Sequence, residues 1–181
     1  MIRGGKAGYE RLKYVNEWGE PGTYDVVYCR FLLEHLSRPL DLLRKMRAVV
    51  RPGGAIVLEN AVGGLFSHPP NEGFAFWARA YPSVLESHGG DPAIGRKLFE
   101  YFLTVGIPSP SLRLVQRATT EGEAKTLPML TIEATADAID AEGIATEDEV
   151  NAARASLMEF TNDPQTVVVG PHVFQLWSRR E

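Results

Sequence analysis

The chain has 181 residues, a length that suits one domain with a sizeable core. Hydrophobic residues make up 44% and charged residues 23%, proportions that are typical of globular proteins. The formal net charge of −4 gives no electrostatic reason to expect nucleic acid or an anionic membrane as a partner. No apolar run reaches bilayer-spanning length and no signal peptide is visible, so the predicted location is the cytoplasm. The single cysteine, Cys29, excludes an internal disulfide framework.

A strand, a helix, a turn and a second strand are predicted in succession over residues 24–60. Residues 25–29 (DVVYC) are too apolar for a half-exposed strand, so they predict a parallel strand buried on both faces. Apolar residues then recur at helical spacing over residues 40–50. Pro52-Gly53-Gly54 ends this helix and turns the chain into the second apolar strand, residues 55–58.

Helical patterns and chain breakers alternate over the rest of the sequence. Asn71 is predicted to cap one helix, and Thr146, with Glu149 three residues later, is predicted to cap another through a capping box. Helices are predicted from Asn71 to Tyr81, over 92–105, over 127–142 with Leu130 and Ile139 facing inward, and from Thr146 to residue 162. Strands are predicted over 112–117 and over 166–178, the latter as a broken final strand or a hairpin around Gly170-Pro171.

The pattern of residues 24–60 resembles the later half of class I S-adenosylmethionine-dependent methyltransferases. In that family the fourth strand ends in an LEH-type segment, here Leu33-Glu34-His35, and a helix then leads to an R-P-G-G turn and the fifth strand. Residues 122–180 also resemble the closing section of bacterial members that act on small molecules. The resemblance implies an α/β Rossmann-like fold, S-adenosylmethionine as cofactor, and methyl transfer to a small-molecule acceptor.

The family's glycine-rich cofactor loop and its acidic ribose-binding residue have no counterpart upstream of the first predicted strand. Gly4-Gly5-Lys6-Ala7-Gly8 follows only three residues, so it is interpreted as a flexible terminus. Residues 12–15 are interpreted as remains of the third strand, with Tyr14 where the family commonly has an acidic residue near the adenine. We therefore expect a truncated sheet, with the family's strands in the order 4-5-7-6 over residues 24–181, that is weak or inactive alone. Residues 1–23 are expected to form an N-terminal segment that is partly flexible or swapped.

A sheet truncated in this way leaves the strand 25–29 at its edge. Unpaired buried backbone groups cost about 1–3 kcal/mol each, against a net domain stability of about 5–15 kcal/mol, so we expect the edge to be covered. A homodimer that pairs two such edges antiparallel across a two-fold axis is the first prediction. Capping by residues 9–18 of the same chain or a neighbour is the alternative. A non-catalytic module derived from a methyltransferase, which self-assembles or binds a partner, is the alternative to an enzyme.

Three residues are candidates for acid–base catalysis. Glu34 and His35 follow the first strand at the edge where α/β sheets bind ligands, and His68 lies in the segment after the second strand. Each also has a structural interpretation. Glu34 and His35 could be a loop pair that orients the next helix, and His68 could be an ordinary loop histidine. Some ubiquinone-biosynthesis O-methyltransferases hold a divalent metal with a Glu-x-x-Glu-His arrangement, but Phe31 stands in the first Glu position, so no metal is predicted.

The resemblance also implies binding residues by position. Cys29, Arg30 and Phe31 are expected beside the methionine part of the cofactor, although Cys29 within an apolar strand also suggests a packed thiol. The family's acceptor pocket is lined or covered by the region after the fifth strand, which predicts a substrate pocket built from Phe66, His68, Phe74, Trp77 and Tyr81. The alternative is a structural core, because aromatic residues at helical spacing pack in cores more often than they line ligand sites.

Overall fold

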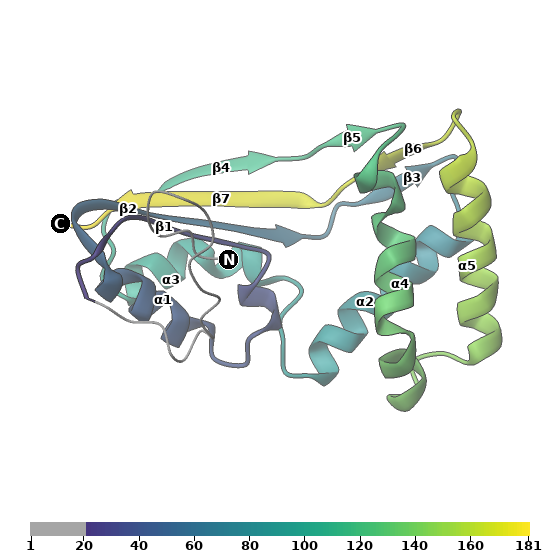
Figure 1. Cartoon of the computed structure of the whole chain (residues 1–181), viewed down its shortest axis with the longest axis horizontal. Coiled ribbons are helices and arrows are strands. Elements are labelled where there is room, and N and C mark those ends of the chain that lie inside the picture. The colour runs from purple at the N-terminus through teal and green to yellow at the C-terminus, as the bar shows by residue number, and fades with distance from the viewer. Residues whose placement is uncertain (1–20) are drawn as a thin grey trace.

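The structure is a computed structural model that describes residues 21–181 (Figure 1). A four-stranded sheet with helices on one face adjoins a bundle of helices that carries a second, smaller sheet. The predictions for residues 4–8, 9–18 and 12–15, Tyr14 included, lie outside the described residues. So does most of the predicted N-terminal segment 1–23.

The larger sheet contains, in spatial order, β1 (Tyr24–Arg30), β2 (Val50–Val62), β7 (His172–Arg179) and β4 (Ser111–Val115). β1 pairs parallel with β2, while β7 runs antiparallel to both β2 and β4. This arrangement confirms the predicted α/β fold class with the strand order 4-5-7-6. Within the described residues β1 lies at the edge of the sheet, also as predicted.

Helices cover one face of the larger sheet (Figure 1). They are η1 (Leu33–His35), α1 (Pro39–Val49), η2 (Ile94–Lys97) and α3 (Leu98–Thr104). Leu43 of α1, Ile56 of β2 and Phe102 of α3 are fully buried in one hydrophobic core between these layers. The helix predicted over 92–105 is confirmed, with a 3₁₀ first turn and an end at Gly106, whose φ of 73° suits the left-handed position after a helix.

No described helix covers the opposite face of this sheet. Val26 and Tyr28 of β1 point to that face and are 58% and 54% exposed, whereas Val27 and Cys29 are buried on the helical side. The prediction that residues 25–29 are buried on both faces is therefore wrong for the described structure. The strand is apolar on both faces, but only one of them packs against helices that the structure describes.

A bundle of three helices lies beyond the carboxyl end of β2 (Figure 1). It contains α2 (Glu72–Ser87), α4 (Glu123–Ala141) and α5 (Glu147–Asn162), and a small sheet of β3 (Phe66–His68), β6 (Val167–Val169) and β5 (Ala118–Thr119) adjoins it. The bundle has its own hydrophobic core. Because β6 pairs with β3 and β5 while β7 pairs with β2 and β4, residues 166–178 form a broken strand shared between two sheets.

The predicted helix starts in this bundle are confirmed at two positions. Asn71 Oδ1 accepts a hydrogen bond from Phe74 N at 2.9 Å, and Thr146 and Glu149 form the reciprocal capping box. α4 differs from its prediction, since it begins at Glu123 and leaves Leu130 52% exposed. α4 instead buries Ile132 and Ile139, together with Pro128 and Lys125, because the positions of α2 and α5 determine which face of α4 is packed.

Candidate functional site

The carboxyl ends of the parallel strands β1 and β2 point toward the helical bundle (Figure 1). Parallel α/β sheets bind ligands at this edge, so the candidate site is the region between the strand ends and the bundle. β1 ends at Arg30, and Glu59 lies opposite it on β2. Polar side chains gather here in two groups, one on each face of the sheet.

The group on the helical face joins η1 to the end of β2. Asn60 Nδ2 donates a hydrogen bond to Glu34 Oε2 at 2.9 Å, and both side chains are buried. His35 Nε2 lies 3.6 Å from the other carboxylate oxygen, Glu34 Oε1. The ring of Tyr81, from α2, approaches His35 edge-on with 6.5 Å between the ring centroids. The predicted catalytic pair Glu34 and His35 and the predicted pocket residue Tyr81 therefore do come together.

Burial affects the pKa values of Glu34 and Tyr81 in this group. It raises the pKa of Glu34, although the Asn60 hydrogen bond and the neighbouring His35 act in the opposite direction. Burial, together with the Glu34 charge, raises the pKa of Tyr81 to about 12. Asn60 Oδ1 is buried and no described residue donates to it. A buried carboxyl group with a raised pKa is suited to acid–base chemistry.

The group on the open face centres on Glu59. Its Oε2 accepts a hydrogen bond from Tyr28 Oη at 3.0 Å and lies 3.2 Å from Arg30 Nε, while its Oε1 accepts from Gln175 Nε2 at 2.7 Å. The Arg30 guanidinium carbon lies 4.6 Å from the centre of the Phe31 ring. Phe31 itself has a φ of 49°, a left-handed conformation that is uncommon for a bulky residue.

The three residues expected near the cofactor do not share one surface. Arg30 and Phe31 lie at the carboxyl edge, whereas Cys29 points into the core on the helical side. Burial raises the pKa of the Cys29 thiol to about 11, so the structure supports the packed-thiol interpretation of this residue.

The five residues of the predicted substrate pocket are not brought together. Phe74 and Trp77 are buried in the core of the bundle, where their rings meet edge to face at 5.2 Å. Phe66 and His68 are exposed on β3. Of the five, Tyr81 is the one that contacts the group on the helical face.

Sequence reasoning missed Glu59 and Asn60. They follow the apolar residues 55–58, just as Glu34 and His35 follow the first strand after a short connection, and this repeated pattern could have revealed them. The contacts of Glu59 with Tyr28 and Gln175 join side chains that are 31 and 116 positions apart in the sequence. Such contacts depend on strand register, for which no local pattern exists.

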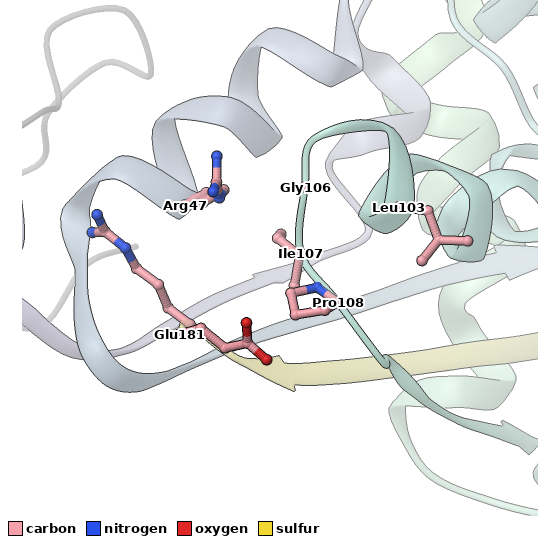
Figure 2. Close-up of a pocket in the computed structure, with 7 residues that line it drawn as sticks. Arg47, Leu103, Gly106, Ile107, Pro108 and Glu181 are labelled. Atoms are coloured by element: carbon pink, nitrogen blue, oxygen red, sulfur yellow. The ribbon is translucent and has the colours of Figure 1, made fainter.

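A surface cavity of about 370 Å³ lies at the other end of the parallel strands, near the start of β2 (Figure 2). Its lining combines the end of α1, the turn after α3 and the end of the chain, through Arg47, Leu103, Gly106, Ile107, Pro108, Arg180 and Glu181. Arg180 Nη1 donates to the main-chain oxygens of Ala48 and Val50, so it caps the exposed end of α1. None of the predicted site residues lines this cavity.

Two features are absent from the described residues 21–181. No group of three or more His, Cys, Asp and Glu side chains is arranged to hold a metal ion. No described helix has both the length and the apolar character needed to cross a bilayer.

A protein-family profile matches part of this chain. The profile of the family described as "Methyltransferase domain" matches residues 7–80, a stretch that includes β1, α1, β2 and the start of α2. This match supports the resemblance to methyltransferases over residues 7–80.

The relatives found by sequence match the chain over short stretches. The ubiquinone biosynthesis O-methyltransferase of Paraburkholderia xenovorans is 51% identical over 35 residues, which are 19% of this chain and 15% of that protein. The enzyme of the same name from Aliivibrio fischeri is 40% identical over 52 residues, or 25% of this chain and 22% of the relative. The chain thus covers less than a quarter of the length of either relative.

Solved structures give weaker likenesses. A methyltransferase from Bacillus halodurans aligns with 88% of this chain and 71% of its own, at a TM-score of 0.49 and 12% identity. An S-adenosylmethionine-dependent methyltransferase from Archaeoglobus fulgidus aligns with 92% of this chain and 63% of its own, at a TM-score of 0.47 and 12% identity. Neither likeness is close enough to carry an argument about activity.

Proposed function

We propose that this chain forms the acceptor side of an S-adenosylmethionine-dependent methyltransferase that acts on a small molecule. One observation carries the proposal: the parallel strands β1 and β2 lie within the stretch that matches the methyltransferase family, and Arg30, Glu34 and Asn60 lie near their carboxyl ends, facing the helical bundle. The reaction would move the sulfonium methyl group to an O, N or C nucleophile, which loses its proton, and would release S-adenosylhomocysteine. Positioning supplies much of the rate in such a reaction.

The described residues fit only one end of the cofactor. Arg30 and Phe31 offer a cation and an aromatic ring at the carboxyl edge, where the methionine part is expected. The chain has no G-x-G pattern anywhere in its sequence, so it offers no loop of the kind that cradles a nucleotide. We therefore propose that the loop that binds the nucleotide of the methyl donor is supplied from outside these 181 residues. The chain alone would then transfer methyl groups weakly or not at all.

On the acceptor side we propose roles that follow from position. Glu34, held by Asn60 and next to His35, is the group placed to accept the acceptor's proton. Tyr81 would contact the acceptor from the bundle, with Phe74 and Trp77 supporting α2 from its core. His68 and Phe66, exposed on β3, would lie at the outer margin of the site.

Methyl transfer tests this proposal directly. The chain should be assayed alone and fused to the N-terminal half of the Paraburkholderia xenovorans relative, with labelled S-adenosylmethionine and a panel of phenols, amines and acids. We expect transfer by the fusion that Glu34→Gln lowers by about 10²-fold or more, the range for a general base. A correctly folded fusion that binds S-adenosylmethionine but methylates no member of the panel would contradict the proposal.

We also propose a homodimer that covers β1, in the cytoplasm. β1 is the edge strand of the described sheet, and an apolar edge invites pairing with another strand. Sedimentation at micromolar concentration should show a dimer, and a monomer throughout this range would contradict the proposal. The alternative of a non-catalytic module is not favoured by the comparisons, since the family match and both relatives are methyltransferases.

A further inference from the structure

We propose that Arg30 is a carboxylate-binding residue whose guanidinium group is positioned by Glu59. The inference rests on the proposed function for the identity of the ligand, but not for the binding itself. The ligand would be the carboxylate of the methyl donor's methionine part or a carboxylate on the acceptor.

The first support is a row of four polar residues across the open face of the sheet. The strand registers place Arg30 opposite Glu59, Glu59 opposite Gln175, and Gln175 opposite Arg113. Each strand of the larger sheet contributes one residue to this row. The row lies between the more apolar row of Tyr28, Val57 and Trp177 and the apolar row of Ala61, Val173 and Val115, so its polar residues stand out on this face.

The second support is the way in which Glu59 holds Arg30. Glu59 is engaged through both oxygens, by Tyr28 and Arg30 on one and by Gln175 on the other, and its side chain is only 15% exposed. Its contact with Arg30 uses Nε, and no described residue bonds to either terminal nitrogen of Arg30. Glu59 therefore fixes the inner side of the guanidinium group and leaves its outer side free, in a side chain that is 52% exposed.

The third support is the conformation of the next residue. Phe31 adopts a φ of 49° and donates its main-chain N–H to the Glu59 carbonyl oxygen at 2.9 Å, and its ring lies against the Arg30 guanidinium. Bulky residues in left-handed backbone occur where the surroundings impose them, often at binding sites. Here the turn places an aromatic surface beside the cation, which restricts the orientation of its plane.

These contacts define the chemistry of the ligand. The two free terminal nitrogens of Arg30 present parallel N–H donors, which match the two oxygens of a carboxylate. The charge of Arg30 is already balanced by Glu59, so recognition would depend on this geometry more than on net charge. A lysine at the same position keeps the charge and loses the paired donors.

Arg113 provides a matched control within the same row. It lies on the open face at the far end of the row, is exposed, and forms no hydrogen bond or ion pair with any described residue. It has the same chemical group as Arg30 without a positioning carboxylate. If the proposal holds, Arg30→Lys weakens carboxylate binding about tenfold and Arg113→Lys leaves it unchanged.

The test is a titration of the full chain followed through the side-chain Nε–H signals of its arginines in NMR spectra. S-adenosylhomocysteine is compared with 5′-methylthioadenosine, which lacks the amino-acid carboxylate, and 4-hydroxybenzoate is compared with phenol. We expect the Arg30 signal, assigned by its loss in Arg30→Lys, to move with the carboxylate member of at least one pair and not with its partner. The pair that discriminates identifies whether the donor or the acceptor supplies the carboxylate.

Three results would overturn the proposal: no response at Arg30 to either carboxylate probe, equal responses within both pairs, or equal losses in Arg30→Lys and Arg113→Lys. Glu59→Gln tests positioning, because it keeps the shape of the side chain and should reduce the preference for the carboxylate probe; an unchanged preference would remove that role. If the Arg30 signal distinguishes a carboxylate probe from its partner but the fusion transfers no methyl group, the proposed function is refuted and the Arg30 site is still supported.

Discussion

Asn60 and Glu34 form a buried pair in which the side-chain nitrogen of Asn60 has a hydrogen-bond partner and its side-chain oxygen has none within residues 21–181. Asn60 Nδ2 donates to Glu34 Oε2 at 2.9 Å, while Asn60 Oδ1 has no donor among the described residues. The pair ties the segment after β1 to the end of β2, so it connects the two strands whose ends form the candidate site.

The first prediction concerns the pH dependence that this pair confers. The pKa of Glu34 is raised in the folded protein, so the folded state binds this proton more tightly than the unfolded state. Its contribution to stability is therefore most favourable in acid and falls as the pH rises from the ordinary glutamate pKa through the raised one. Glu34→Gln should remove this dependence and, because it replaces a buried carboxyl group by a neutral amide, stabilise the protein by about 1 kcal/mol at pH 7.

Urea denaturation between pH 4 and pH 8 measures this effect. Asn60→Asp is a useful counterpart, because it places a second carboxylate beside Glu34 and should destabilise the fold most at high pH. A Glu34→Gln protein that loses stability at pH 7 while keeping its fold would show that the ionised carboxylate is the stabilising form.

The second prediction concerns Cys29. Its thiol is buried beneath α1 and burial raises its pKa to about 11, so very little thiolate exists at pH 8. We expect a maleimide or a disulfide reagent to modify the native protein far more slowly than the protein in denaturant. Rapid and complete modification of the folded chain would show that the strand opens or that Cys29 is accessible.

The third prediction concerns the start of α2. Asn71 caps this helix through Oδ1 and, through Nδ2, donates to Ser156 Oγ of α5 at 2.9 Å. Asn71→Ala should cost about 1–2 kcal/mol in the free energy of unfolding, since it removes both the cap and the link between helices. Asn71→Asp keeps the capping oxygen and should lose less, so equal losses in the two variants would argue against the cap.

The fourth prediction concerns the crossing of α2 and α5. A Cβ added at Gly73 would collide with the main-chain oxygen of Ala153 and lie 2.9 Å from Leu157 Cγ. Gly73→Ala should therefore destabilise the bundle by about 1–3 kcal/mol despite the higher helix propensity of alanine. The exposed residue Ala75 in the same turn gives the comparison, because Ala75→Gly tests propensity alone and should cost about 1 kcal/mol. A gain of stability in Gly73→Ala would contradict the close packing.

Local patterns predicted the parts of this fold that local interactions determine. The Asn71 and Thr146 caps depend on side chains within three residues of the helix start, and both were predictable. The strand order also followed, because the family resemblance of residues 24–60 places the adjoining elements. The open face of β1 was not predictable, since Val26 and Val27 are chemically alike and only the surrounding layers distinguish them.

In the candidate site, too, some residues could be recognised from the local sequence and others only from the folded structure. Glu34 and His35 were recognisable from their place after an apolar strand, whereas Glu59 acquires its role from Tyr28 and Gln175 on two other strands. The aromatic residues of α2 were ambiguous for a physical reason, because packing in a core and lining a pocket require the same spacing. The structure separates them, with Phe74 and Trp77 inside the bundle and Tyr81 against His35.

The central claim is that these residues form the acceptor side of a methyltransferase and do not contain the loop that binds the nucleotide of its methyl donor. Isothermal titration calorimetry of the 181-residue chain with S-adenosylhomocysteine tests it most directly. We predict no saturable heat in the micromolar range and a Kd weaker than about 1 mM, because a single carboxylate contact at Arg30 cannot replace a nucleotide loop. A Kd of about 10 μM or tighter for the chain alone would contradict the claim, since it would require a complete donor site built from this polypeptide.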